Sequence, residues 1–287
     1  MSSPQRDAEV AIIGLGVIGG SAALRLRERG TPTRGFSASA ADRELARKSG
    51  IAVTETLDQA VKDVGLVLIA VPIDRICAVA TQVIGAAPPS ATILHAGSLQ
   101  RLEAVHELPE VGARVIGTHP LAGSHLTGFG GARADLFSGA TIFVERRASP
   151  RQREDAELFW SMAGAKRVEY TSANEHDAAM AWVSHLPQLA STALASTLAD
   201  KTSLAIPLVP GPGARDATRL AMSTLEIWQP ILDRAPAETT SALRALETHL
   251  QQLRIALESR DWESVRGIWS AAHDWREAAE HREGQGG

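Results

Sequence analysis

The sequence predicts an α/β protein in which a doubly wound parallel sheet is followed by an all-helical domain. In the first half, short apolar runs rich in Val, Ile and Leu alternate with amphipathic segments. Runs without polar alternation are typical of parallel strands covered on both faces, and strand–helix–strand repetition favours right-handed crossovers. In the second half, apolar residues recur three and four positions apart, which is the spacing of helices.

The strands of the sheet are expected at the apolar runs. These runs cover residues 8–14, 31–37, 65–72, 90–97, 113–120 and 139–145. The intervening stretches 21–30 and 41–50 are expected to be helices, because each is amphipathic and ends at a glycine, a common helix stop.

The helical half is predicted to start at Ser149 and Pro150, because a Ser-Pro pair is a helix start signal. Helices are expected within residues 150–164, 175–200 and 237–281. The predicted units are a sheet domain at 1–149, a helical domain at 150–281 and a disordered tail at 282–287. The cleft between the two domains is the natural place for a ligand.

Composition narrows the function classes. With 44% hydrophobic and 22% charged residues, the chain is typical of a soluble globular protein. The net charge of −4 gives no basic excess for nucleic acid or an anionic membrane. The single cysteine, Cys77, excludes an internal disulfide and a multi-cysteine metal site, and no metal is predicted. The N-terminus is polar and no run is as long as a membrane span, so we expect a cytoplasmic protein.

A glycine-rich turn directly follows the first predicted strand. Gly14, Gly16 and Gly19 have GxGxxG spacing at the mouth of a helix. In this context the three glycines permit a tight turn, close approach of a pyrophosphate and close helix–strand packing, as in a Rossmann dinucleotide site. The alternative is a glycine turn that binds nothing. The residues expected to contact the dinucleotide are Gly14, Gly16, Val17, Ile18, Gly19, Val71 and Pro72.

The second predicted strand ends without the acidic residue that usually bonds the ribose 2′-hydroxyl of NAD. Ser37 stands in that place, and Ser39 and Arg43 follow within reach. These three side chains can hold a 2′-phosphate, which a carboxylate would repel. We therefore favour NADP over NAD; the alternative is that they are surface loop residues and that NAD binds without the acid.

Motifs along the chain resemble those of the prephenate/arogenate dehydrogenase family of tyrosine biosynthesis. They occur in the order GLGVIGGS, LIAVP, GSLQ, GTHPLAGS…TGF…ADLFSGATIFV, HDAAMAWVSHLPQ and RDATRLAMSTLEIW. The resemblance covers about residues 8–275. It implies a dinucleotide-binding N-terminal domain and a helical substrate domain that forms a homodimer. The implied reaction is oxidative decarboxylation of prephenate to 4-hydroxyphenylpyruvate, with hydride transfer to NAD(P).

Two residues are expected to act on the reacting atoms. The resemblance places the family's catalytic histidine at His119, in the HPLAGS motif; a neutral imidazole can accept the C4-hydroxyl proton. It also places a serine near that hydroxyl and the nicotinamide at Ser98. The alternatives are a hydrogen-bonded structural histidine and a helix N-cap, respectively.

Other residues are expected to bind the cyclohexadienyl substrate. Arg219 resembles the family arginine that grips a carboxylate, for which a guanidinium offers a bidentate fork; otherwise it is an exposed helix charge. Trp228 matches a tryptophan that reaches the pocket, possibly that of the partner subunit, and is otherwise a core residue. Pro187 bends its helix and can turn His185 or Gln188 toward the cleft, or serve packing alone.

Several positions depart from the family pattern around the pocket. Gln188 stands where most relatives have the last histidine of SHLPH, and His95 and Gln100 replace an aspartate and a lysine. In the HPLAGS motif, Ser124 is expected to bind substrate, and His125 after it to lie at the pocket edge or in a solvated loop. These changes leave arogenate and 4-amino-4-deoxyprephenate as alternative substrates.

Two other functions compete with this interpretation. A hydroxyacid or imine reductase also joins a nucleotide domain to a helical one, but the HPLAGS motif argues against it. A non-catalytic, NAD(P)-sensing regulatory protein would not need His119, Ser98 and Arg219 together.

Overall fold

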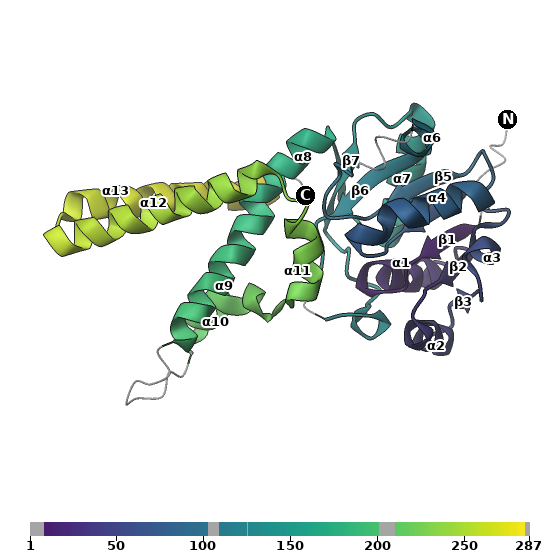
Figure 1. The fold of residues 1–287 in the computed structure, drawn as a ribbon, viewed down its shortest axis with the longest axis horizontal. Coiled ribbons are helices and arrows are strands. Elements are labelled where there is room, and N and C mark those ends of the chain that lie inside the picture. Colours follow the sequence, from purple (N-terminus) through teal and green to yellow (C-terminus); the bar gives the residue numbers. More distant parts are fainter. Residues whose placement is uncertain (1–8, 103–108, 125, 201–209, 285–287) are drawn as a thin grey trace.

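The computed structural model describes residues 9–102, 109–124, 126–200 and 210–284, and in them a single sheet dominates the first half (Figure 1). The strand order is β3-β2-β1-β4-β5-β6-β7-β8. The strands are β1 Val10–Ile13, β2 Thr33–Phe36, β3 Ala52–Val53, β4 Leu66–Ile69, β5 Thr92–His95, β6 Val115–Pro120, β7 Thr141–Glu145 and β8 Arg167–Thr171.

The sheet is doubly wound, as predicted, because the chain runs outward from β1 in both directions. All pairings among strands β1 to β6 are parallel. The predicted parallel sheet has one antiparallel pairing, since β7 runs antiparallel to β6 while β8 is parallel to β7. An apolar run has the same composition in either direction, so the sequence pattern did not reveal the reversal.

Helices cover both faces of the sheet. They are α1 Val17–Glu28, α2 Ala40–Lys48, α3 Leu57–Val61, α4 Ile76–Ala86, α6 Pro109–Arg114 and α7 Pro150–Ala163, with 3-10 turns η1 Ile73–Arg75 and η2 Phe129–Gly131. Two clusters of buried side chains form the core. Ile12 belongs to one cluster with Phe159 and Trp160, whereas its neighbour Ile13 belongs to the other with Ile76. Successive strand residues point to opposite faces, so each cluster lies on one face.

The sheet region continues past the predicted boundary at 149/150. The Ser149 capping box does start a helix, α7. However, α7 buries Phe159 and Trp160 in the sheet's core and leads to β8, which pairs with β7. The Ser-Pro signal therefore marks the start of a helix rather than of a domain. The helical half begins at Ser172, the N-cap of α8.

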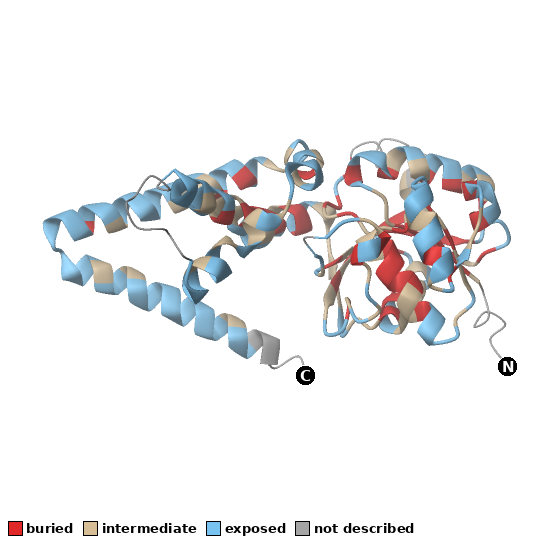
Figure 2. Cartoon of the chain, turned by 90° about the horizontal axis from the view of Figure 1, so that it is seen from below, coloured by how far each residue is buried: buried red, intermediate tan, exposed pale blue. Residues whose placement is uncertain are grey.

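The helical half consists of several shorter helices followed by a hairpin of two long helices. The helices are α8 Ala173–Met180, the π-helix η3 Ala181–His185, α9 Leu186–Ala199, α10 Pro212–Thr218, the 3-10 turn η4 Arg219–Met222, α11 Leu225–Leu232, α12 Ala237–Ser259 and α13 Trp262–Gly284. Figure 2 shows α12 and α13 as a long hairpin that is exposed along most of its length. Helix α13 includes residues 282–284 of the predicted tail; residues 285–287 lie outside the described part.

Among the described helices, none combines the length and apolar character needed to cross a membrane.

Candidate active site

The glycine turn is built for close approach of another molecule. Gly14 has a φ of +99°, and a Cβ there would lie 2.5 Å from the Ala70 carbonyl oxygen. A Cβ on Gly19 would lie 1.9 Å from the Gly14 oxygen, so both positions require glycine. Gly16 is different: among the described atoms, nothing lies within 4 Å of a Cβ placed on it. The α1 N-terminus next to Gly16 is the kind of place where phosphate groups bind in proteins.

The other residues predicted to contact the dinucleotide lie near this turn, and they differ in how exposed they are. Val17 and Ile18, both half-buried, lie in the first turn of α1. This first turn, all of it described, contains no acidic residue. Val71 lies directly beside the turn, since its Cγ1 would be 3.0 Å from a Cβ on Gly14. Pro72 is exposed and precedes η1.

The loop after β2 places a cation where the ribose is expected. The Arg43 guanidinium folds back and donates to the carbonyl oxygens of Ser37 at 2.6 Å and Ala38 at 3.1 Å. The Ser39 hydroxyl caps α2 by accepting from the Asp42 N–H. The buried Ser37 hydroxyl accepts from the Ser39 N–H at 3.3 Å. The three residues predicted to hold a 2′-phosphate are thus adjacent, at a helix N-terminus.

His119 lies at the carboxyl end of β6 and is half-buried. Its Nδ1 is 2.9 Å from Nε2 of His176, and Nδ1 of His176 is 2.7 Å from a carboxylate oxygen of Asp177. Asp177 in turn accepts the backbone N–H groups of Gln100 and Arg101, both at 2.8 Å. A continuous hydrogen-bonded chain therefore runs from the sheet half to α8 in the helical half.

The environment of His119 favours the neutral imidazole. Burial lowers the pKa of His119 to about 3, and the neighbouring His176, His95 and His185 act in the same direction. Burial also lowers the pKa of His185, although Asp177 opposes that shift. Four of the nine histidines of the chain thus belong to one cluster. This shift favours an uncharged His119 ring at neutral pH.

His185 and Gln188 are buried, and both side chains form hydrogen bonds within the protein. His185 Nδ1 is 2.8 Å from the Thr239 hydroxyl, and its ring makes an edge contact with Trp228 at 6.1 Å between centroids. Gln188 donates to the Leu220 carbonyl oxygen at 3.0 Å. Pro187 lies in the first turn of α9, directly after the π-helix η3, and such π segments are frequent at functional sites.

The remaining predicted substrate residues are less enclosed. Arg219 is exposed on η4, next to the Leu220 carbonyl that Gln188 fixes. Trp228 is half-buried on α11 and packs against the core of the sheet half. Ser98 is half-buried in the loop after β5; no helix forms over the described residues 99–102, so it is not an N-cap. Ser124 is exposed, and His125 lies outside the described residues.

His176 and Asp177 were not predicted as site residues. The sequence did contain a signal, since the two lie side by side in the motif HDAAMAWVSHLPQ. A cavity of about 770 Å³ lies between the two halves, where the sequence analysis placed a ligand cleft. Its wall includes Ile73, Cys77 and Leu102 from the sheet half and Asn174, Asp177 and Pro236 from the helical half. None of the predicted site residues is among the described residues that line it.

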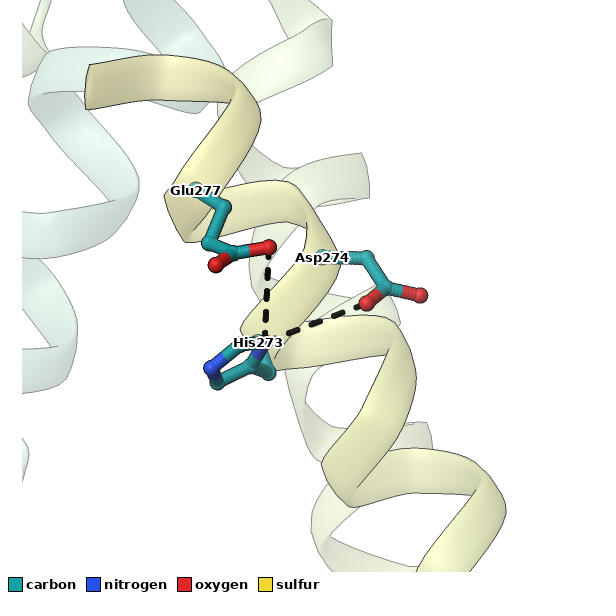
Figure 3. A group of neighbouring side chains, drawn as sticks. All are labelled: His273, Asp274 and Glu277. Carbon is teal, nitrogen blue, oxygen red and sulfur yellow. Dashed lines mark ion pairs between the residues drawn. The ribbon is translucent and has the colours of Figure 1, made fainter. Parts of the chain in front are cut away.

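One group on α13 has ligand atoms close enough for a metal ion. His273, Asp274 and Glu277 project together from the helix, with Nδ1 of His273 3.9 Å from an oxygen of each carboxylate (Figure 3). All three side chains are exposed on the long hairpin. His273 and Glu277 are one turn apart, where side chains on a helix surface commonly meet, and all three residues are exposed, so we assign the group no metal.

Comparisons with known proteins match both halves of the chain. The family model described as prephenate dehydrogenase, nucleotide-binding domain, matches residues 22–169. The model described as prephenate dehydrogenase, dimerization domain, matches residues 172–270. The two matches meet where β8 ends and α8 begins. A cyclohexadienyl dehydrogenase of Zymomonas mobilis is 30% identical over 264 residues, which cover 88% of this chain and 89% of that protein.

Solved structures show the same fold. A prephenate dehydrogenase of A. aeolicus, crystallised with hydroxyphenyl propionate and NAD+, is similar with a TM-score of 0.84 and 24% identity, over 96% of this chain and 100% of that chain. An arogenate dehydrogenase of Synechocystis is similar with a TM-score of 0.77 and 23% identity, over 94% of this chain and 99% of that chain.

Proposed function

The chain belongs to the prephenate dehydrogenase family, and we propose that it oxidatively decarboxylates prephenate to 4-hydroxyphenylpyruvate. The observation that supports the proposal most directly is the state of His119. Desolvation lowers the pKa of its ring to about 3, the side chain is partly exposed, and no described residue hydrogen-bonds its Nε2. It lies at the carboxyl edge that β6 shares with β1, β4 and β5, which is where ligands bind in this architecture.

In the proposed reaction, His119 accepts a proton from the substrate and later returns it. When bound, the oxidised nicotinamide supplies an acceptor for the hydride of C4. His119 Nε2 accepts the C4-hydroxyl proton, so the oxygen lone pair can form the C=O bond as the hydride leaves. Loss of carbon dioxide from C1 returns the electron pair to the ring, which becomes aromatic. His119 then returns its proton to the phenolate oxygen, and the overall reaction releases no net proton.

The other predicted residues hold the substrate in this proposal. Arg219 takes a substrate carboxylate, because its exposed guanidinium offers a bidentate fork. Ser98, in the loop after β5, hydrogen-bonds the C4 oxygen. Trp228 and His185, in edge contact with each other, form a wall of the pocket. Gln188 fixes the turn that carries Arg219, because its amide group donates to the neighbouring Leu220 carbonyl.

The experiment is an initial-rate comparison of three substrates with two cofactors. The pure protein is incubated with prephenate, arogenate or 4-amino-4-deoxyprephenate, each with NAD and with NADP. We expect reduced cofactor and 4-hydroxyphenylpyruvate, with the highest kcat/KM for prephenate. A higher kcat/KM for either amino compound reassigns the substrate. Absence of reduced cofactor in all six mixtures contradicts the proposed function.

A His119→Asn variant tests the proposed base. We expect turnover to fall at least about 100-fold, the scale of a lost general base, while cofactor affinity is retained. His249→Asn, an exposed histidine on α12, serves as the matched control and keeps the wild-type rate. Normal turnover by His119→Asn would show that another group accepts the proton.

For the cofactor, we propose NADP rather than NAD. Three observations support this proposal. The Arg43 guanidinium lies against the β2–α2 loop, and the N-terminus of α2 is capped. The described loop has no acidic residue at positions 37–39. Arg43→Ala is expected to raise KM for NADP about tenfold or more and to leave KM for NAD nearly unchanged. Arg47→Ala, one turn further along α2 and paired with Glu55, is the control. Equal KM changes for both cofactors would contradict the assignment.

We also propose that the protein is a homodimer joined through its helical half, because the family model that matches residues 172–270 describes a dimerization domain.

A further inference from the structure

The two ring nitrogens of His119 cannot exchange roles in the proposed reaction. The nitrogen that faces the substrate must carry a lone pair before the hydroxyl proton arrives and must give that proton back at the end. A neutral histidine has two tautomers, and only one of them leaves a lone pair on Nε2, the nitrogen that does not face His176. The hydrogen bonds around His119 bear on which tautomer is present.

The selection starts at Asp177, which is 4% exposed. Its two carboxylate oxygens accept the backbone N–H groups of Gln100 and Arg101, and one of them also faces Nδ1 of His176 at 2.7 Å. Since backbone N–H groups can only donate, both oxygens of Asp177 act as acceptors. Nδ1 of His176 must then carry the proton of the bond to Asp177.

The direction of the remaining bond follows from this. When both rings are uncharged, His176 donates from Nδ1 and keeps a lone pair on Nε2, so it accepts from Nδ1 of His119 across 2.9 Å. The proton of neutral His119 therefore resides on Nδ1, and the lone pair of its Nε2 is left for the substrate. His176 is 1% exposed and its ring contacts Phe143, so it has little freedom to turn over.

We infer that His176, oriented by Asp177, is a positioning residue that fixes the His119 tautomer and shares the proton His119 borrows. The inference rests on the proposed function. When the O–H bond of the substrate breaks, the proton binds Nε2 of His119. The Nδ1 proton of His119 then shifts toward Nε2 of His176, while the Nδ1 proton of His176 shifts toward Asp177. Each shift reverses when the phenolate oxygen takes its proton back, so protons and charge balance.

The electrostatics of the cluster agree with a shared proton. Because His119 is largely desolvated, its isolated imidazolium would be poorly stabilised, and a second positive charge on His176 would oppose it further. A single proton held jointly by the two rings and opposed by the Asp177 carboxylate avoids both costs.

The first test reads the tautomer directly and does not need turnover. Ring-¹⁵N-labelled histidine is incorporated, the protein is saturated with the preferred cofactor, and His119 and His176 signals are assigned by comparison with single variants. We expect a proton on Nδ1 and none on Nε2 in both rings at pH 7.5. A proton on Nε2 of His119 overturns the inference, whatever the activity.

The second test compares two substitutions of one residue. His176→Phe keeps an aromatic ring against Phe143 but cannot accept from His119, so kcat is expected to fall at least about 100-fold with KM little changed. His176→Gln places an amide oxygen where it can accept from Nδ1 of His119, and is expected to recover at least about tenfold of that loss. His273→Gln on α13 is the control with unchanged rate. Asp177 is left intact because it also holds the backbone at Gln100 and Arg101.

The outcomes separate the two proposals. Equal rates for His176→Phe and the control, or a His176→Gln rate no higher than that of His176→Phe, overturn the inference while the proposed function stands. If the wild-type protein turns over none of the three substrates, the proposed function fails, and the nitrogen signals alone decide the role of His176.

Discussion

His119 combines two properties that a proton acceptor needs at neutral pH. His119 lies at the end of β6 and is partly exposed, and no described residue hydrogen-bonds its Nε2. Burial of the rest of the ring lowers its pKa to about 3, which keeps it unprotonated well below neutral pH. A buried imidazole held neutral in this way has a measurable consequence for folding.

The free energy of unfolding should fall with acidification because of His119. Above pH 6.5, the ring is neutral in both the folded and the unfolded chain, and its contribution is constant. As the pH falls from 6.5 toward 3, the unfolded chain takes up a proton at this position and the folded protein does not, so the unfolded state is favoured. Denaturant unfolding at pH 7.5 and pH 5 measures the difference.

We expect His119→Asn to lose less stability than the wild-type protein between these two pH values. His273→Asn, which replaces an exposed histidine on α13, should lose as much as the wild-type protein. An equal loss in His119→Asn and wild type would show that His119 does not remain neutral in the folded state.

At the scale of elements, the glycine turn between β1 and α1 separates packing from ligand binding. Gly19→Ala would place a methyl group against the Gly14 carbonyl oxygen. This oxygen belongs to the backbone, so relieving the clash requires a backbone shift. We expect a loss of unfolding free energy of about 1–3 kcal/mol or more. Gly16→Ala meets open space and should keep stability within about 0.5 kcal/mol, yet weaken dinucleotide binding, because the added methyl group occupies the pyrophosphate's approach.

Urea unfolding and cofactor titration of the two variants check this pair. Unchanged cofactor affinity in Gly16→Ala would place the pyrophosphate elsewhere. Wild-type stability in Gly19→Ala would mean that α1 can move away from β1 without cost.

The elements that the sequence predicted are those with a simple periodic signal. The six apolar runs correspond to β1, β2, β4, β5, β6 and β7. Strand β8 was missed because its sequence, RVEYT, is polar and its side chains are at most half-buried. Strand β3 has only two residues and offers no pattern.

The site was predictable only where one short motif carries it. The glycine turn and His119 each lie in a short sequence motif that indicates a particular chemistry. The bond from His119 to His176 joins residues 57 positions apart, and its existence depends on how α8 packs beside β6 and β7. A pairing of this kind is set by tertiary packing, which local periodicity does not encode.

At the scale of the whole molecule, the hairpin of α12 and α13 exposes several large apolar side chains, and a large exposed apolar patch marks an interaction surface. Among its described residues, several large apolar side chains are at least half-exposed or close to it: Leu250, Ile255, Leu257, Trp262, Trp269 and Trp275. Figure 2 shows the hairpin extending away from the sheet half, which leaves these faces uncovered within one chain. A second copy would bury them.

We therefore expect the protein to sediment as a dimer and Trp269→Glu to shift it toward the monomer. Trp269 is 67% exposed, and tryptophan contributes strongly to interfaces because its large ring is desolvated there. The matched control is Leu158→Glu, which replaces a 51% exposed leucine on α7 of the sheet half with the same charge. Sedimentation at several protein concentrations should give a dissociation constant at least about tenfold higher for Trp269→Glu than for wild type, and an unchanged one for the control. If both variants dimerise like the wild type, the dimer contact lies outside α13, and the apolar face of that helix must be covered in another way.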